Sequence, residues 1–185
     1  MENENEELNG NENENENEDI NEIEDNLWLG NKIAAENIED LKKKGIKKIL
    51  TVMNSSSDSY FFNEHGFIHK IIDILDEDYE NIIQYFGECI RFINGGEKVL
   101  VHCGAGASRS PTIVIAYLMW KNTMSFDDAL KFVQKKRSIV CPNSGFKKQL
   151  KMFENILYEN DYDIDKINFK NIKYIPPIHM YSSYY

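Results

Sequence analysis

The chain has few cysteines, and they are not spaced as a metal site or a disulfide framework requires. Its 185 residues include three, Cys89, Cys103 and Cys141, an odd number without metal-ligand spacing. We therefore expect no metal and no disulfide-stapled secreted fold. Unpaired thiols are typical of a reducing compartment. This predicts a cytoplasmic protein, with the nucleus as the alternative.

Long hydrophobic runs are also missing. No segment is long and apolar enough to span a bilayer, and the first residues lack the apolar core of a secretory signal. A general excess of positive charge is missing too, because the net charge is −10. From these absences we expect that the protein binds neither a membrane nor a nucleic acid.

Basic residues are absent from the first 26 positions, which hold ten Glu and two Asp and so carry −12. The net charge of −10 leaves the rest of the chain at +2. The acidic part is mostly Asn and Glu, with too little apolar surface to offset the entropy of ordering. We predict a disordered tail at 1–25, a folded domain at 26–158 and a C-terminal extension at 159–185 without clear periodicity.

The most informative segment that is present reads HCGAGASRS, from His102 to Ser110. It follows a short apolar run and precedes a long one, which predicts a strand, a tight loop and a helix. A glycine-rich loop that opens a helix turns several backbone N–H groups into one concavity, a site for phosphate. Cys103 opens this loop and Arg109 closes it. A thiol in such surroundings ionises more readily than a free cysteine and can act as a nucleophile.

A buried structural cysteine followed by a glycine turn is the simpler interpretation of Cys103 alone. The combination with Arg109, whose planar fork of donors matches phosphate oxygens, favours a catalytic loop instead.

Strand and helix patterns alternate along the domain. Strands are predicted at 26–30, 46–52, 67–75 and 98–101, and helices at 34–44, 79–93, 110–121, from 125 onward and at 143–158, with a polar loop at 54–60. This alternation predicts an α/β fold, a mostly parallel central sheet flanked by helices, with the phosphate loop between a strand and a helix.

At these residues the chain resembles the dual-specificity phosphatases, a branch of the cysteine-dependent protein phosphatases, in their small atypical form. The resemblance runs from about Asn26 to Tyr158 and rests on "HCGAGASRSPT", "IAYLMW" and "CPNSGFKKQL". It implies that Cys103 becomes a phosphocysteine and that Ser110 helps the thiol to leave. It also implies that His102 orients the cysteine.

The resemblance further assigns phosphate binding to the loop and a supporting role to Asn143. The phosphate-binding residues are Gly104, Ala105, Gly106, Ala107, Ser108 and Arg109. Arg137 has two interpretations, a second support of the loop or a surface arginine. The remaining histidines are scattered and suggest neither a metal cluster nor a triad.

A general acid must protonate the leaving oxygen. The candidates in the sequence are Asp73, Asp76, Glu77, Asp78 and Glu80. The resemblance selects Asp76 from its register with Ile72 and Phe86, and Asp78 is the nearest competitor.

The resemblance implies hydrolysis of phosphotyrosine and phosphoserine or phosphothreonine in proteins, without a cofactor. A phosphoinositide or other non-protein phosphatase of the same superfamily is the alternative. Phosphoinositide phosphatases of this superfamily place lysines in this loop to meet additional phosphates, whereas residues 104–108 contain none. A phosphate-binding scaffold without turnover is another alternative. Protein kinases are further candidate partners, and the sequence does not predict an oligomeric state.

Overall fold

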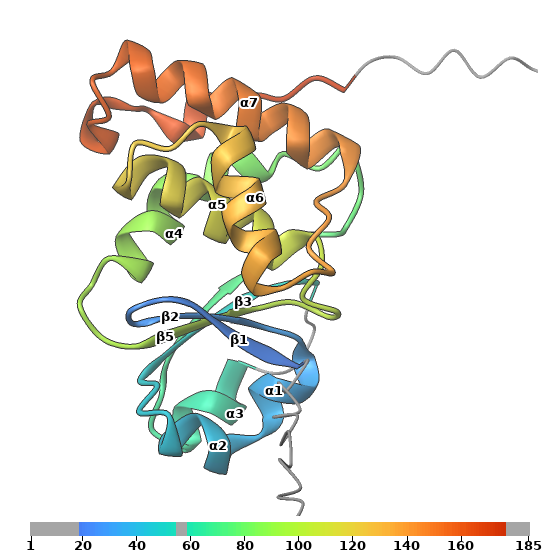
Figure 1. The fold of residues 1–185 in the computed structure, drawn as a ribbon, viewed down its shortest axis with the longest axis vertical. Coiled ribbons are helices and arrows are strands. Elements are labelled where there is room, and N and C mark those ends of the chain that lie inside the picture. The colour runs from blue at the N-terminus through green and yellow to red at the C-terminus, as the bar shows by residue number, and fades with distance from the viewer. Residues whose placement is uncertain (1–18, 55–58, 177–185) are drawn as a thin grey trace, which may run out of the picture.

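The computed structural model describes residues 19–54 and 59–176. Its centre is a five-stranded sheet in the order β1-β2-β5-β3-β4 (Figure 1). The strands are β1 Ile20–Glu24, β2 Leu27–Gly30, β3 Lys48–Val52, β4 Ile68–Ile72 and β5 Val99–His102. Strand β1 is antiparallel to β2, whereas the other neighbouring pairs are parallel. The predicted α/β fold with a mostly parallel sheet is therefore confirmed.

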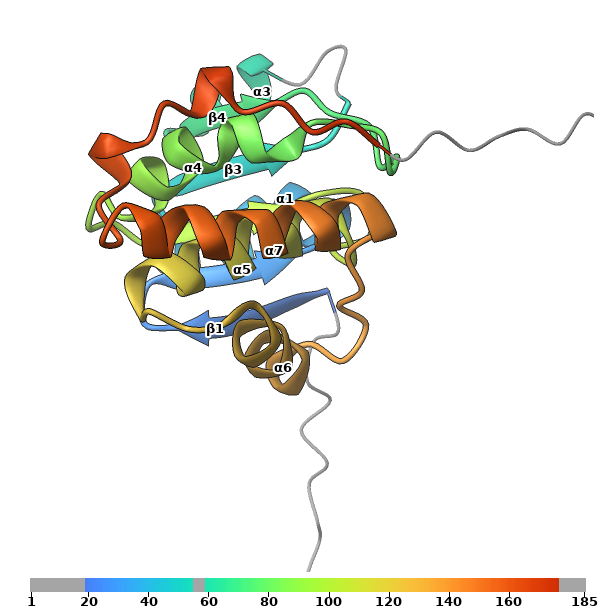
Figure 2. The same cartoon turned by 90° about the horizontal axis from the view of Figure 1, so that it is seen from above.

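Helices cover both faces of the sheet, as Figures 1 and 2 show. On one face lie α1 Lys32–Glu36, α2 Ile38–Lys43 and α3 Ser59–Glu64. On the other lie α4 Phe86–Ile93, α5 Arg109–Lys121, α6 Phe126–Lys136 and α7 Ser144–Glu159. Because both faces are covered, every residue of the central strands β3 and β5 is buried.

The parallel strands set the place of the site. The chain leaves β5 at His102 and enters α5 at Arg109, so the loop between them lies at the carboxyl edge of the sheet. Ligands of open parallel sheets bind at this edge. Helix α5 is buried along most of its length, which anchors the loop to the core.

Strand β1 corrects the prediction of a disordered tail at 1–25. Ile20 and Ile23 are buried in the core, which drives this edge strand onto β2 despite the surrounding Glu and Asn. Lys121 of α5 also pairs with Glu24. The other expected tail residues, 1–18, lie outside the described residues.

Other element boundaries also differ from the predictions. The helix expected at 34–44 is divided, because the side chain of Asn37 caps a new helix by accepting from the backbone N–H of Asp40. The helix expected at 79–93 begins with the 3₁₀ helix η1, Ile82–Tyr85. The loop expected at 54–60 gives way to α3 at Ser59.

The residues after α7 pack onto the domain. They form the short 3₁₀ helices η2 Ile164–Lys166 and η3 Phe169–Asn171, and run back beside α4 (Figure 2). Ile164 and Phe169 are buried in the core, and Phe169 lies directly against Gly87 of α4. The described part of the C-terminal extension therefore belongs to the folded body.

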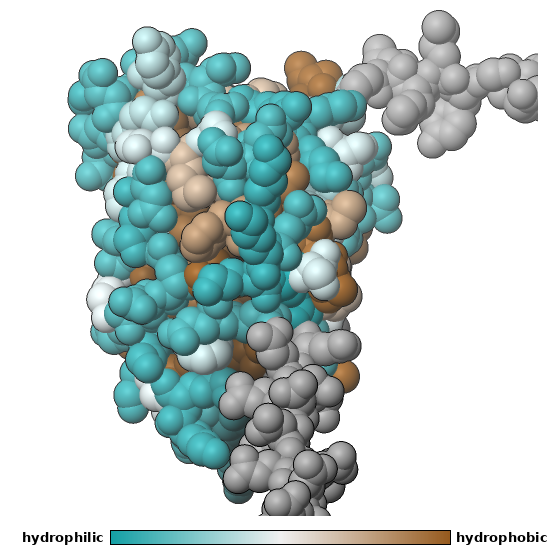
Figure 3. Space-filling view, viewed as in Figure 1, coloured by the Kyte–Doolittle hydropathy of each residue, from teal (hydrophilic) through white to brown (hydrophobic). Residues whose placement is uncertain are grey.

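The face drawn in Figure 3 is mostly hydrophilic, and its hydrophobic residues show between polar side chains. Within residues 19–54 and 59–176, no helix has both the length and the apolar character that crossing a membrane requires. The same residues contain no cluster of His, Cys, Asp and Glu that could hold a metal ion.

Candidate active site

Cys103 lies at the base of the loop, with 1% of its surface exposed. Its Sγ accepts hydrogen bonds from the backbone N–H of Gly106, at 3.3 Å, and from the hydroxyl of Ser110, at 3.1 Å. Two donors thus converge on one sulfur atom. The structure therefore brings Cys103 and Ser110 together, as the sequence predicts.

Gly106 is required by the shape of the loop. Its φ is +69°, a conformation that side chains disfavour. A Cβ there would lie 2.6 Å from the carbonyl oxygen of Gly30. Glycine therefore allows both the turn and the hydrogen bond to Cys103.

The carbonyl groups of the loop are bonded to the elements around it. The backbone N–H of Lys32 donates to Gly104, Arg137 donates to Ala105 and Gly106, and the backbone N–H of Cys141 donates to Ala107, over 2.7–3.1 Å. With these carbonyls held by outside partners, the backbone of the loop is fixed around the thiol, and the N–H groups of such a loop can bind an anion.

Arg109 holds its guanidinium partly buried beside this loop. Its Nη1 donates a long hydrogen bond to the carbonyl of Ile74, at 3.5 Å. Its buried Nε has no hydrogen-bond partner among the described residues, and the nearest carboxylate oxygen, on Asp76, lies 3.8 Å away. A buried donor without an acceptor is costly. The site is therefore ready for an anion with several oxygens.

Asp76 lies over the loop. One of its carboxylate oxygens accepts from the hydroxyl of Ser108, at 2.6 Å, and from the side-chain amide of Asn143, at 2.9 Å. The other oxygen faces Arg109. For Asp78, by contrast, the backbone packs directly against Gly145 of α7. Of the two candidates, Asp76 is the one that these contacts bring to the loop.

Asn143 joins three parts of the site. It is the N-cap of α7, where its side-chain oxygen accepts from the backbone N–H of Phe146 at 2.8 Å. The backbone N–H of Asn143 donates to the hydroxyl of Ser108, at 3.1 Å. The expected support of the loop is thus present as a set of contacts.

Arg137 is a support and not a surface residue, because only 4% of it is exposed. Its Nε and Nη2 donate to the loop carbonyls of Gly106 and Ala105, at 3.0 and 3.1 Å. Its Nη1 donates to the side chain of Asn21 in β1, at 2.8 Å. Asn21 was not predicted to contact the loop, because it lies in the segment expected to be disordered.

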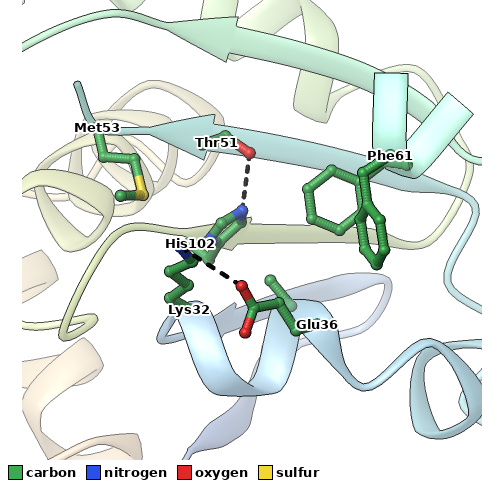
Figure 4. Close-up of a pocket in the computed structure, with 8 residues that line it drawn as sticks. Lys32, Glu36, Thr51, Met53, Phe61 and His102 are labelled. Atoms are coloured by element: carbon green, nitrogen blue, oxygen red, sulfur yellow. Dashed lines mark hydrogen bonds and ion pairs between the residues drawn. The ribbon is translucent and has the colours of Figure 1, made fainter. Parts of the chain in front are cut away.

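His102 points away from the loop, toward the face covered by α1 and α3. Its Nε2 lies 2.7 Å from the hydroxyl of Thr51, which in turn lies 2.8 Å from Nε2 of His69. Thr51 and His102 border a cavity of about 250 Å³ (Figure 4). Neither Thr51 nor His69 was identified from the sequence, since their contacts join separate strands.

The other two cysteines differ from Cys103 in their surroundings. Cys89 is fully buried on α4, and burial raises the pKa of its thiol. Cys141 is exposed, and all three cysteines are free. This arrangement is consistent with a packing role for Cys89.

The arrangement of Cys103, Arg109 and Asp76 agrees with what the resemblance to the cysteine-dependent phosphatases implies. The family model of the dual specificity phosphatase catalytic domain matches residues 27–156. Dual specificity protein phosphatase 1B of Arabidopsis thaliana is 37% identical over 158 residues, which cover 83% of this chain and 93% of that protein.

Two solved structures agree. The Yvh1 phosphatase domain from Chaetomium thermophilum aligns with a TM-score of 0.70 and 31% identity, covering 78% of this chain and 99% of that one. The human tyrosine phosphatase-like serine/threonine/tyrosine-interacting protein aligns with a TM-score of 0.71 and 36% identity, covering 76% and 99%. The chain therefore belongs to the dual specificity phosphatase family, hydrolases that act on phosphorylated proteins.

Proposed function

We propose that Cys103 is the nucleophile of a two-step hydrolysis. Its thiolate attacks phosphorus, the bond from phosphorus to the substrate oxygen breaks, and a phosphocysteine forms. The observation that carries this proposal is the position of Cys103, which accepts from Gly106 and Ser110 beside the open donors of Arg109. Arg109 and the loop amides bind the phosphoryl oxygens, where charge develops in the transition state.

In this mechanism Asp76 gives its proton to the leaving oxygen. A phenoxide or alkoxide is a poor leaving group, and such protonation contributes typically about 10²–10⁴-fold to the rate. In the second step water attacks the phosphorus of the phosphocysteine, Asp76 accepts a proton from that water, and the bond from sulfur to phosphorus breaks to release inorganic phosphate. Ser110 donates to the sulfur as the thiolate leaves, which is supported by its 3.1 Å contact.

Proteins carrying phosphotyrosine and phosphoserine or phosphothreonine are the proposed substrates. Residues 104–108 contain no lysine, so the loop offers no side-chain cation for a second phosphate. This favours a phosphoprotein over a phosphoinositide. Protein kinases are proposed partners within this class.

The cytoplasm, with the nucleus as the alternative, is the proposed location. The support is chemical, since Cys103 must stay a reduced thiol to act as nucleophile.

The test uses the purified chain and its Cys103→Ser variant. Wild type should hydrolyse para-nitrophenyl phosphate and phosphopeptides without added metal, and faster than it hydrolyses phosphoinositides. Cys103→Ser should keep its circular dichroism spectrum and lose turnover. Near wild-type turnover by that variant would refute the mechanism, and a preference for phosphoinositides would refute the substrate class.

A further inference from the structure

Three side chains from three adjacent strands form a continuous hydrogen-bonded chain behind the nucleophile. They are His69 of β4, Thr51 of β3 and His102 of β5. Thr51 and His102 are opposite each other in the pairing of β3 with β5, and both are buried. His69 is half-buried, at the outer strand. The chain thus links Cys103's neighbour to a more accessible histidine.

The single hydroxyl hydrogen of Thr51 limits the directions of the hydrogen bonds among these three side chains. A threonine hydroxyl has one hydrogen to donate, so it can donate to only one of the two imidazole nitrogens. The other imidazole must then be the donor to Thr51. If both rings donated, the buried hydroxyl would face two donors and have no acceptor for its own hydrogen, an unfavourable arrangement. If one imidazole ring donates to Thr51, the other ring must therefore accept from Thr51.

The two rings differ in their access to solvent. His69 is half-buried on the edge strand β4, whereas His102 is buried, so a proton from solvent reaches His69 more directly. A protonated His69 must donate to Thr51. Thr51 then donates to Nε2 of His102, which stays neutral with its proton on Nδ1.

We propose that His69 is a positioning residue that, through Thr51, sets the tautomer and orientation of His102. The inference rests on the proposed role of Cys103, whose backbone His102 adjoins. It goes beyond that role by assigning a function to two residues on strands β3 and β4.

Other groups surround this chain of three residues. Lys32 and Glu36 of α1 form an ion pair and line the cavity beside Thr51 and His102. Figure 4 shows the hydrogen bond between Thr51 and His102 at the wall of this cavity. From α3, Phe62 lies edge-on to His69, with ring centroids 4.6 Å apart. His65 of α3 bonds to the carbonyl of Phe61 and so provides a histidine outside the chain of three.

The direct test is nitrogen-15 NMR of the imidazole rings across a pH titration. In wild type, the tautomer of His102 should change over the pH range in which His69 titrates. In Thr51→Val, which keeps the shape and removes the hydroxyl, the two rings should titrate independently. Independent titration in wild type would overturn the proposal.

The second test measures alkylation of Cys103 by iodoacetate in a Cys141→Ser background, where the exposed thiol is absent. Thr51→Val and His69→Leu should slow alkylation at pH 6 by about threefold or more, equivalent to about half a pKa unit. Thr51→Ser should restore the rate, because it restores the hydroxyl. His69→Gln should restore it too, because its amide can donate to Thr51.

The matched control is His65→Leu, which should react like wild type. An equal loss in His65→Leu, or wild-type rates in both folded Thr51→Val and His69→Leu, would overturn the proposal. Alkylation needs no turnover, so its rate reports the effect of Thr51 and His69 on the thiol even if Cys103 is not the nucleophile. Failure of the proposed function would appear separately, as turnover that survives Cys103→Ser.

Discussion

At the scale of single residues, Asp76 combines two demands. As the structure stands, its carboxylate is held by donors from Ser108 and Asn143 and faces Arg109. In the proposed mechanism the same carboxyl group gives its proton to the leaving oxygen. A phosphate dianion that takes the guanidinium of Arg109 removes the contact of that guanidinium with Asp76. Substrate binding therefore frees one oxygen of Asp76 to face the leaving group.

Replacing Asp76 tests this role. Asp76→Asn should slow hydrolysis of phosphotyrosine peptides by about 10²-fold or more and flatten the alkaline limb of the pH–rate profile. Esters with very acidic leaving groups should lose less, since they need little protonation. Asp78→Asn is the matched control and should keep most activity. The reverse pattern in the two variants would reassign the acid to Asp78.

Ser110 should act after the first step. Ser110→Ala removes a hydroxyl donor to the leaving thiolate, and a hydrogen bond to a charged group is worth about 1.5–3 kcal/mol. Breakdown of the phosphocysteine should slow by about 10-fold or more, so the phosphoenzyme should accumulate. Rapid-quench kinetics should then show a burst of product. A slow first step without a burst would contradict this assignment.

At the scale of elements, the N-terminus of α7 is tied to the catalytic machinery. Asn143 caps the helix with its side-chain oxygen and holds Asp76 with its side-chain nitrogen. Gly145 lets the first turn approach the backbone of Asp78 so closely that a Cβ there would collide with its carbonyl oxygen. The side chain of Asn143 therefore both caps the helix and holds the proposed acid in place.

Two substitutions at position 143 separate these functions. Asn143→Ser keeps a capping oxygen and loses the donor to Asp76, so activity should fall while thermal stability stays close to wild type. Asn143→Ala loses both and should be less stable by about 1 kcal/mol. Thermal denaturation and kcat of both variants check this. Equal stability of Asn143→Ala and wild type would show that the cap contributes little.

The elements also show what sequence patterns can and cannot predict. The loop was predictable because the order of strand, glycine-rich turn and helix is local. The capping of α6 was predictable too: Ser125 accepts from the backbone N–H of Asp128. Strand β1 was not, because its two buried isoleucines lie within an acidic run and their burial depends on β2.

Long-range contacts were equally hidden in the sequence. Phe169 belongs to the core only because Gly87, far away in the sequence, leaves room for its ring. Likewise, the interactions of Arg137 with Asn21 and of Thr51 with His69 depend on how separate elements pack. Periodicity within one segment carries no signal for such contacts.

At the scale of the whole molecule, the acidic N-terminal segment does not end where the described structure begins. Residues 1–18 contain eight Glu and no basic residue. Residues 20–24 are also acidic, yet they form β1 and carry Asn21, which holds Arg137. The acidic composition therefore extends into a strand that supports the catalytic loop.

Two truncations test this division. Deleting residues 1–18 should leave thermal stability almost unchanged, whereas deleting 1–25 should lower it and reduce activity, because Ile20, Ile23 and the contact of Asn21 with Arg137 are lost. Each buried isoleucine contributes about 1.5–3 kcal/mol. Differential scanning calorimetry and kcat measure the two effects. Equal stability of both truncated proteins would show that β1 is dispensable.

The same truncation tests an electrostatic effect of the acidic segment on substrate binding. Eight negative charges next to a near-neutral domain can compete with phosphate for the pocket, over a screening length of about 8–10 Å. Deleting residues 1–18 should then lower KM at low salt with little change in kcat, and the difference should vanish as salt rises. The control replaces the eight Glu by Gln at constant length, and it should reproduce the lower KM because only charge is removed. An unchanged KM at low ionic strength in both proteins would exclude competition by the acidic segment.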